Sequence, residues 1–282
     1  MKRVLITGKN SYIGTSFENW LAQWPDDYEV YTLDMLGDDW RSFNFSGYDV
    51  VFHVAGIAHV KETKRNRDLY YQVNRDLAVD TARKAKAEGV KHFVFLSTMS
   101  VYGLEKGIIT KDTPTIPTNA YGKSKLEAER IISSLSDNQF VVAVLRPPMV
   151  YGKGCKGNYP RLAKLVLKAP IFPDVENKRS MIYIDNLSAI VRKILDNIEG
   201  GIFYPQNSEY VNTTEMAVLI AKAHGKELRI TKLFNPLIKI IRVNNINKVF
   251  GTLMYSNELP GILGKEDSSP LQFVNTINLS EG

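Results

Sequence analysis

The sequence has little of what builds cross-links or metal centres. Among its 282 residues there is one cysteine, Cys155, which cannot form an intramolecular disulfide. The four histidines, His53, His59, His92 and His224, show none of the spacings that bind zinc, so we predict no metal site. These absences exclude a disulfide-stapled secreted domain and a zinc module, and they fit a protein of the reducing cytoplasm.

Long apolar runs are also missing. The longest, around residues 50–58, has nine residues with a histidine among them, whereas a membrane-spanning helix needs about 20. The apolar run of Val4, Leu5 and Ile6 is too short for the hydrophobic region of a signal peptide. We therefore expect a cytoplasmic protein with no membrane partner.

The chain has no block of charge of one sign. It carries 36 Lys and Arg against 30 Asp and Glu, a net charge of +6, but the two signs alternate, as between Lys123 and Arg130. The densest basic patch, Lys61 to Arg67, still contains Glu62, and is typical of a solvated face. No basic helix or aromatic-basic ribonucleoprotein motif is present, so we expect no nucleic-acid partner. The excess of positive charge suits a small phosphorylated substrate.

Short β-rich runs alternate with helical patterns through the first half of the chain. The predicted strands cover residues 3–7, 29–34, 50–54, 93–97 and 140–145, and the predicted helices cover residues 14–24, 68–88 and 120–134. This alternation is typical of βαβ units, and it predicts an α/β fold with a doubly wound parallel sheet of the Rossmann type.

Beyond Pro147 and Pro148 the pattern becomes irregular and rich in glycine and proline. We predict a dinucleotide-binding domain over residues 1–152 and a mainly substrate-binding region over residues 153–282. A strand and helix at about 181–198 are expected to return to the sheet, and a further helix is predicted at 213–224. The tail after Gly264 shows no periodicity, and we expect it to be partly disordered.

A turn with two glycines follows the first predicted strand. It reads Thr7-Gly-Lys-Asn-Ser-Tyr-Ile-Gly14 and opens a helix, the place where backbone approaches a pyrophosphate in dinucleotide-binding folds. The glycines are six residues apart, one more than the outer pair of G-x-G-x-x-G. An ordinary strand-to-helix turn is the alternative interpretation.

Asp34 ends the second predicted strand, 20 residues after Gly14. A carboxylate at that position accepts hydrogen bonds from an adenosine ribose and favours NAD over NADP. Lys9 or Arg41 could offset its repulsion of a 2′-phosphate, so the cofactor preference stays open. A turn residue after a strand is the alternative interpretation.

Tyr121 and Lys125 lie four residues apart on a helix that Thr118 or Asn119 caps. A tyrosine has a pKa near 10, so its use as an acid or base at neutral pH needs a nearby cation, which Lys125 supplies. A surface tyrosine and lysine would be the safer interpretation by themselves, but their occurrence with the glycine turn and Asp34 favours a catalytic pair.

Hydroxyl side chains cluster where the strand at 93–97 ends. Ser97, Thr98 and Ser100 follow one another there, and in open parallel sheets ligands bind at the carboxyl ends of the strands. Thr98 or Ser97 is placed to hydrogen-bond the oxygen that gains or loses a proton. The alternative is a polar strand end that caps the next segment.

Together these pieces resemble the extended short-chain dehydrogenase/reductase family, specifically its members that modify nucleotide sugars. Further matching pieces are His53-Val-Ala-Gly56, Asn74, the run from Gly89 to Gly103, Leu145-Arg-Pro147 and the run from Arg179 to Leu187. The resemblance covers most of the chain, and the six-residue spacing of Gly8 and Gly14 is the family's own. Ser11 departs from the family's usual middle glycine.

The resemblance implies a role for each matching residue. Tyr121 is then the catalytic acid/base, Lys125 holds the nicotinamide ribose and lowers the pKa of Tyr121, and Thr98 binds the reacting hydroxyl. The implied contacts of NAD(H) or NADP(H) are Gly8, Asn10, Ser11, Tyr12, Ile13, Gly14, Asp34, Ala55, Gly56, Asn74, Tyr121 and Lys125. The implied substrate contacts are Thr98, Ser100, Tyr121, Asn158 and Arg179, with Tyr159 in the same loop as Asn158.

The family performs several reactions on nucleotide sugars. Its 4,6-dehydratases carry an Asp-Glu pair where this chain has Met99 and Ser100, so elimination lacks its carboxylates. Reduction of a 4-keto sugar and 4-epimerisation share hydride chemistry at C4. The short chain and the overall pattern favour a reductase acting on a UDP-4-keto-6-deoxy-N-acetylhexosamine, whereas Asp34 favours an NAD-dependent UDP-hexose 4-epimerase as the alternative.

A different class of function is a regulatory protein that binds the dinucleotide without turnover. Such proteins usually lose the tyrosine and lysine, so Tyr121 and Lys125 count against it. The resemblance also implies a homodimer.

Overall fold

The structure is a computed structural model, and it describes residues 1–58, 60–233, 235, 249–259 and 271–282. The chain divides into two compact units. The first contains residues 1–103, 114–147 and 187–205, and the second contains residues 104–113, 148–186 and 206–282. The chain therefore crosses between the units several times, so the second unit is not a simple C-terminal domain.

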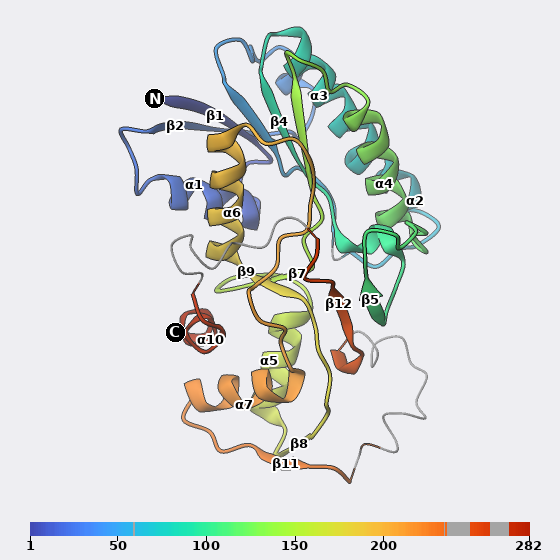
Figure 1. Ribbon diagram of the computed structural model, residues 1–282, viewed down its shortest axis with the longest axis vertical. Coiled ribbons are helices and arrows are strands. Elements are labelled where there is room, and N and C mark those ends of the chain that lie inside the picture. Colours follow the sequence, from blue (N-terminus) through green and yellow to red (C-terminus); the bar gives the residue numbers. More distant parts are fainter. Residues whose placement is uncertain (59, 234, 236–248, 260–270) are drawn as a thin grey trace. The chain divides into compact units, whose positions relative to one another are not determined.

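The first unit contains a six-stranded parallel sheet in the order β10-β6-β4-β3-β1-β2 (Figure 1). Its strands are β1 (Lys2–Thr7), β2 (Tyr28–Leu33), β3 (Val50–His53), β4 (His92–Leu96), β6 (Val141–Leu145) and β10 (Gly201–Phe203). Every residue of β3 and β4 is buried, as expected for strands that are covered on both faces. The predicted doubly wound α/β fold is confirmed.

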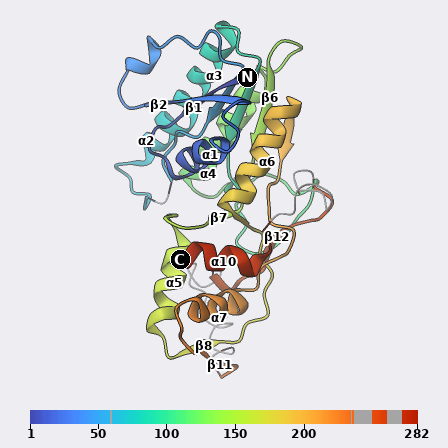
Figure 2. The same cartoon turned by 90° about the vertical axis from the view of Figure 1, so that its left-hand side faces the viewer.

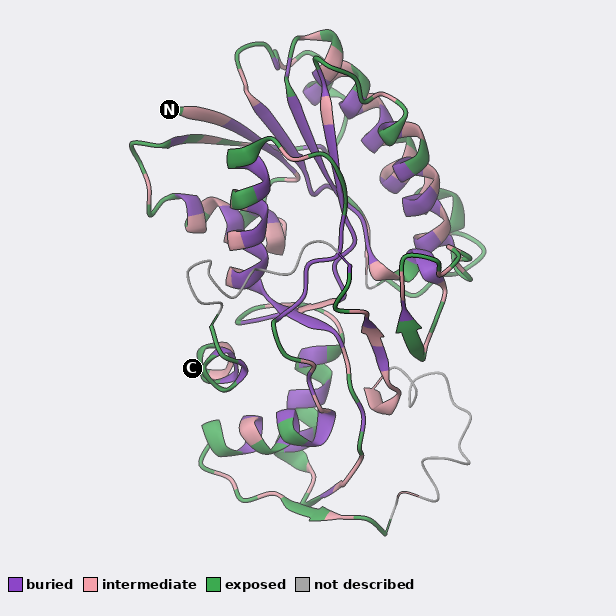
Figure 3. Cartoon of the chain, in the orientation of Figure 1, coloured by how far each residue is buried: buried purple, intermediate pink, exposed green. Residues whose placement is uncertain are grey.

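Helices cover both faces of this sheet (Figures 1 and 2). Helices α3 (Ala78–Ala87) and α4 (Ala120–Ser133) lie on one face, and α1 (Tyr12–Leu21) and most of α6 (Ile184–Asn197) lie on the other. Their inward faces are buried and their outward faces exposed, as Figure 3 shows. Amphipathic periodicity in the sequence therefore corresponds to sheet-facing stripes.

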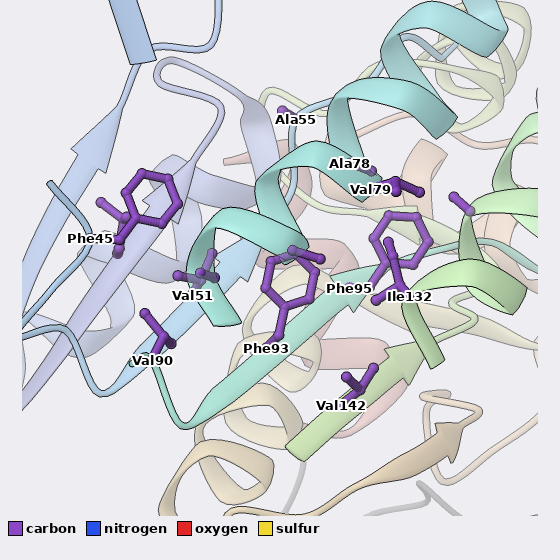
Figure 4. Packing of buried hydrophobic residues seen from close by; sticks show 14 of the residues in the cluster. Phe45, Val51, Ala55, Ala78, Val79, Val90, Phe93, Phe95, Ile132 and Val142 are labelled. Carbon is purple, nitrogen blue, oxygen red and sulfur yellow. The ribbon is translucent and has the colours of Figure 1, made fainter. Parts of the chain in front are cut away.

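One continuous apolar core lies between the sheet and the α3–α4 layer. Phe93 and Phe95 of β4 point toward Ala78 of α3 and Ile132 of α4 (Figure 4). These four side chains are fully buried. Burial of each large apolar side chain stabilises the fold by about 1.5–3 kcal/mol, so this layer fixes α4 firmly against the strands.

The strand order reverses at β1, which pairs with β2 on one side and β3 on the other. In doubly wound sheets the crevice at such a reversal binds the ligand, at the carboxyl ends of the strands. The loops after β1 and β3 therefore meet at the expected ligand site.

A π-helical segment interrupts the helix predicted at 68–88. The structure has α2 (Arg67–Tyr71), then the π-helix η2 (Gln72–Leu77), then α3. Such segments are rare and often lie at functional sites, because they turn a side chain out of the α-helical register.

The segment that returns to the sheet differs from the prediction. Strand β9 (Met181–Tyr183) pairs with β7 (Met149–Tyr151) in the second unit, and β10 is the strand that joins the sheet. Residues 187–205, not 181–198, belong to the first unit, and residues 104–113 and 148–152 belong to the second. Because β9 is fully buried, its sequence looks like a central strand, whereas the three-residue β10 carries no period-2 signal.

The second unit combines helices with short parallel strand pairs. Its helices are α5 (Asn158–Lys168), α7 (Thr213–Ala223) and α10 (Phe273–Glu281), and its further strand pairs are β5 (Gly107–Ile109) with β12 (Leu253–Tyr255) and β8 (Ile171–Pro173) with β11 (Arg229–Thr231). Helices α5 and α10 both pack against α7 (Figure 2). The predicted helix at 213–224 is confirmed as α7.

The tail expected to be partly disordered contains α10. Residues 265–270 of this tail lie outside the described part of the chain, but Phe273 and Ile277 are buried in a regular helix. The helix lacks charge patterning and a strong apolar stripe, so the sequence gives no periodic signal for it.

Candidate active site

Two glycines shape the turn between β1 and α1. Gly8 has a φ of 108°, and a Cβ at this position would lie 2.9 Å from the amide nitrogen of Ala55. A Cβ on Gly14 would lie 2.6 Å from Ser11 Oγ and 3.1 Å from Val54 Cγ2. Both positions therefore keep side-chain atoms away from the N-terminus of α1, where a diphosphate binds in such folds.

Ser11, which stands in place of the family's usual middle glycine, caps α1. Its Oγ accepts a hydrogen bond from the amide of Gly14 at 3.2 Å. Serine is among the best N-cap residues, so the departure from glycine strengthens the helix terminus. Asn10 has a left-handed φ of 62°, which asparagine tolerates, and Tyr12 and Ile13 form the first turn of α1. All four residues lie in the β1–α1 turn or the first turn of α1.

Asp34 follows β2 directly and is exposed. Its Oδ1 accepts a hydrogen bond from the amide of Leu36 at 2.9 Å, and the residue lines a cavity of about 320 Å³ together with Lys9 and Trp40. The carboxylate thus has a fixed place on the wall of a cavity large enough for part of a small ligand.

Arg41, the other cation that could balance Asp34, already has two acidic partners. Its Nε donates to Asp38 Oδ1 at 3.2 Å, and its Nη2 donates to Asp80 Oδ2 at 3.2 Å. Both pairs are exposed, and their hydrogen bonds raise the pKa of Arg41. The guanidinium of Arg41 is therefore held by Asp38 and Asp80.

The loop after β3 rests on Asn74, which the π-helix η2 turns inward. Asn74 is fully buried, its Oδ1 accepts from the amide of Ile57 at 2.9 Å, and its Nδ2 donates to the carbonyl of Ile57 at 3.1 Å. A Cβ on Gly56 would lie 2.8 Å from Asn74 Oδ1 and 3.3 Å from Lys125 Nζ. Asn74 therefore holds the loop at Ile57 with two hydrogen bonds, while the missing Cβ of Gly56 leaves space beside Lys125.

Thr98, Tyr121 and Lys125 come together at the carboxyl end of β4. Tyr121 lies in the first turn of α4, which Asn119 caps, and its phenol shares a hydrogen bond with the Thr98 hydroxyl. Lys125, one turn further along α4, is buried and donates from Nζ to the carbonyl oxygen of Leu96 at 2.8 Å. The structure thus places a proton donor, a hydroxyl partner and an ammonium group within one small region.

Ser100 lies beside this group in the 3-10 helix η3 (Met99–Tyr102). Thr98 caps that helix, since its Oγ1 accepts from the amide of Ser100 at 3.1 Å and lies 3.2 Å from Ser100 Oγ. Ser100 itself is exposed. The hydroxyl cluster predicted from the sequence is therefore a capped turn as well as a set of donors.

Burial shifts the pKa values of both Tyr121 and Lys125. It raises the pKa of Tyr121 above its ordinary value of 10.0, and the hydrogen bond from Thr98 opposes part of that rise. Burial lowers the pKa of Lys125 to about 8, and the negative charge of Glu129 opposes this fall. The resemblance implies that Lys125 lowers the pKa of Tyr121, but the ammonium is bound to a carbonyl and burial dominates. The phenol is therefore protonated at neutral pH.

The predicted substrate residues Asn158 and Arg179 belong to the second unit. Asn158 is exposed and opens α5. Arg179 donates from Nη1 to the carbonyl of Gly251 at 2.5 Å, and burial lowers its pKa to about 10. Tyr159 lines a cavity of about 470 Å³ in this unit, and its hydroxyl donates to Glu281 Oε1 at 2.5 Å.

A family model decides the identity. The model of the NAD dependent epimerase/dehydratase family matches residues 4–204, which is more than half of the chain. The chain belongs to this family.

Individual relatives agree with this assignment. A UDP-glucose 4-epimerase of Vibrio cholerae is 32% identical over 254 residues, which cover 80% of this chain and 76% of the relative. The crystal structure of a dTDP-4-dehydrorhamnose reductase from Clostridium acetobutylicum matches with a TM-score of 0.68 and 25% identity, covering 81% of this chain and 82% of that one. A UDP-glucuronic acid 4-epimerase from Bacillus cereus, in complex with NAD, matches in fold with a TM-score of 0.75, 19% identity and coverage of 99% and 97%.

This epimerase/dehydratase family member is thus an NAD(P)-dependent enzyme of the nucleotide-sugar 4-epimerase and 4-reductase group. The cradle formed by Gly8, Gly14 and Gly56, which a Cβ would fill, fits a dinucleotide. In the described part of the chain, no cluster of three or more His, Cys, Asp or Glu residues could hold a metal ion. Among the helices of those residues, none is long and apolar enough to cross a membrane.

Sequence reasoning missed Tyr70, which packs against the proposed acid. Its ring lies 6.4 Å from that of Tyr121 in an edge-on arrangement, it is buried, and its hydroxyl donates to the carbonyl of Val60 at 2.6 Å. Nothing in the local pattern of residues 67–71 signals this contact, because it depends on how α2 meets α4. Only the tertiary structure brings the ring of Tyr70 against that of Tyr121.

Proposed function

We propose that this enzyme reduces the 4-keto group of a UDP-4-keto-6-deoxy-N-acetylhexosamine. The observation that carries this proposal is the arrangement of Tyr121, Thr98 and Lys125 at the end of β4, where burial raises the pKa of Tyr121 and so favours its protonated form. A ketone that accepts a hydride at C4 needs a proton on its oxygen, and a protonated phenol donates one. Oxidation of a C4 hydroxyl needs the phenolate instead, which burial disfavours.

Each residue then has a distinct task. The dinucleotide, when bound, supplies the hydride. Thr98 holds the C4 oxygen against Tyr121, and Tyr121 gives its proton to that oxygen as the carbonyl becomes a hydroxyl. Lys125 would hold the nicotinamide ribose with its buried ammonium, and solvent restores the proton of Tyr121 after the transfer.

The residues around the adenosine position support NAD(H) as the cofactor. Asp34 presents its carboxylate on the cavity wall after β2, where a ribose 2′-hydroxyl donates and a 2′-phosphate is repelled. Of the two cations that could offset that repulsion, Arg41 is bound to Asp38 and Asp80, whereas Lys9 lines the same cavity. We propose Asn158 and Arg179 as contacts of the nucleotide-sugar diphosphate, because an amide and a guanidinium both donate to phosphate oxygens.

An NAD-dependent UDP-hexose 4-epimerase is the second candidate function. The 32% identity with the Vibrio cholerae UDP-glucose 4-epimerase favours it, and so does the carboxylate of Asp34, since an epimerase keeps one NAD through both hydride transfers. The same Tyr121, Thr98 and Lys125 set serves both reactions.

One incubation separates the two candidates. Purified protein is mixed with UDP-glucose, with UDP-N-acetylglucosamine, or with enzymatically prepared UDP-4-keto-6-deoxy-N-acetylglucosamine, each with NADH or NADPH. Products are analysed by mass spectrometry and NMR. A reductase consumes reduced cofactor and adds two hydrogens to the keto sugar. An epimerase yields C4 epimers of unchanged mass without net consumption of cofactor, and that result would replace the reductase proposal.

A further inference from the structure

A buried ion pair lies directly behind the proposed active site. Glu129 follows Lys125 by one turn of α4, and both are buried, with 3% and 4% of their surface exposed. The guanidinium of Arg146, at the end of β6, donates to Glu129 from Nη2 at 2.6 Å and from Nε at 3.2 Å. Arg146 Nη1 also donates to the Tyr102 hydroxyl at 2.8 Å.

Such a pair is not explained by stability. Removing two charges from water costs several kcal/mol per ion, and apolar residues of similar volume often stabilise a core equally well. Its position therefore calls for another reason.

The ion pair is tied to residues 96–98 after β4, and these residues contact both Lys125 and Tyr121. The Ser97 hydroxyl donates to Glu129 Oε1. On one side of Ser97, the carbonyl of Leu96 accepts from Lys125. On the other side, Thr98 hydrogen-bonds the phenol of Tyr121. Glu129 thus holds Ser97, which lies between Leu96, the partner of Lys125, and Thr98, the partner of Tyr121.

The charges around Lys125 give Glu129 a second effect. The charged or titratable groups that act on the ammonium are Glu129, one turn along α4, and His53 of β3, while Arg146 after β6 pairs with Glu129. Burial keeps His53 neutral by lowering its pKa to about 3, so Glu129 is the only anion in this set. Without that carboxylate, Lys125 would lose the anion that opposes the effect of its burial, and the buried Arg146 would lose its ion-pair partner.

We propose that Glu129, held by Arg146, is the positioning residue that aligns the 96–98 strand end with α4 and keeps Lys125 charged during hydride transfer at C4. This inference rests on the proposed function for its kinetic consequence, while its effect on Lys125 is measurable without turnover.

The first test measures the charge of Lys125 directly. Protein labelled with ¹³C in its lysine side chains is titrated by NMR, and the Lys125 signal is assigned by its loss in Lys125→Arg. Glu129→Gln is expected to lower the titration midpoint by about one pH unit or more. Glu127→Gln is the matched control, because Glu127 lies on the same helix and pairs with Arg75 at the surface. An unmoved midpoint in Glu129→Gln overturns the proposal, whether or not any substrate is turned over.

The second test measures kcat and KM between pH 6 and 10 with the substrate that the incubation described above identifies. Glu129→Gln should lower kcat at least ten-fold at pH 8 and move the alkaline limb of its pH profile to lower pH, with KM little changed. The double variant Glu129→Gln/Arg146→Met removes both charges and should return the limb toward its wild-type position. A uniform loss of kcat with an unmoved limb would mean that the pair is only structural.

One further variant keeps the tests separate. If Glu129→Gln does not fold, Ser97→Ala removes one tie without changing charge, and it should lower kcat about ten-fold with the limb unmoved; wild-type kcat there contradicts the alignment. Inactive wild-type protein would instead count against the proposed function, and the NMR titration would still decide the inference.

Discussion

At the residue scale, Tyr121 is the residue whose replacement should affect catalysis but not cofactor binding. Its phenol touches Thr98 and Tyr70, and it belongs to no helix cap or buried ion pair. Tyr121→Phe should therefore lower kcat by about 10²–10⁴-fold, the usual contribution of one acid or base, and leave the Kd of NADH unchanged. Tyr71→Phe, on the neighbouring helix, should keep wild-type kcat. Comparable rates in Tyr121→Phe and the control would remove the tyrosine from the mechanism.

Asp34 should determine the choice of cofactor. Asp34→Asn removes the charge that we propose binds the ribose and repels a 2′-phosphate, and a hydrogen bond to a charged group contributes about 1.5–3 kcal/mol. We expect the Kd of NADH to rise at least about ten-fold and that of NADPH to stay equal or fall, as measured by fluorescence titration. Asp26→Asn, an exposed change outside the cavity, is the control. Equal weakening of both cofactors would contradict a ribose contact.

Most site residues could be predicted from the sequence because they belong to local motifs. Gly8 and Asp34 directly follow strands, and Thr98 lies two residues after one. Tyr121 and Lys125 share a helix face, so spacing alone locates these residues. The structure adds what depends on contacts between elements. The edge-on packing of Tyr70 and the pairing of Arg41 with Asp80 join residues that no sequence pattern connects.

At the element scale, the β1–α1 turn and the loop after β3 depend on each other. A Cβ on Gly8 would press on the backbone of Ala55 at 2.9 Å, and backbone cannot move aside cheaply. Gly8→Ala should therefore lower the free energy of unfolding by about 1–3 kcal/mol and weaken NADH binding. Gly89→Ala shares the strain of a positive φ, at 81°, but meets nothing within 4 Å. If both variants bind NADH alike, close approach of the two loops is not what shapes the site.

Elements were predictable in proportion to their length and periodicity. The long, regular α4 was placed within one residue at its C-terminus, and α7 similarly. The π-helix η2 was not foreseeable, because its register shift arises from the inward turn of Asn74 toward Ile57. Strand β10 has only three residues, and its pairing with β6 follows from the path of α6 rather than from its own sequence.

At the scale of the whole molecule, the homodimer implied by the resemblance stays a prediction. Sedimentation equilibrium would test it, with about twice the chain mass of 31.9 kDa expected. A mass that stays at one chain over a wide concentration range would contradict it.

Two buried histidines should make the whole first unit sensitive to acid. Burial lowers the pKa of His53 to about 3 and that of His92 to about 4, whereas an unfolded histidine titrates near 6.5. Between these values the unfolded chain binds more protons, so the free energy of unfolding falls as the pH falls below about 6.5 and levels off near pH 3. The linkage at each histidine should lower the free energy of unfolding by about 1.6 kcal/mol between pH 6.5 and pH 5.

Urea unfolding at pH 7.5, 6.5 and 5 would measure this loss through tryptophan fluorescence, which reports on the first unit because all three tryptophans, Trp20, Trp24 and Trp40, lie there. His92→Gln keeps a donor for the carbonyl of Glu199, 3.0 Å from His92 Nε2, but removes the titration, so it should halve the loss between pH 6.5 and 5. His224→Gln removes an exposed histidine and should keep the full loss. The same steep loss in His92→Gln would show that other groups, and not buried imidazoles, set the acid limit of the fold.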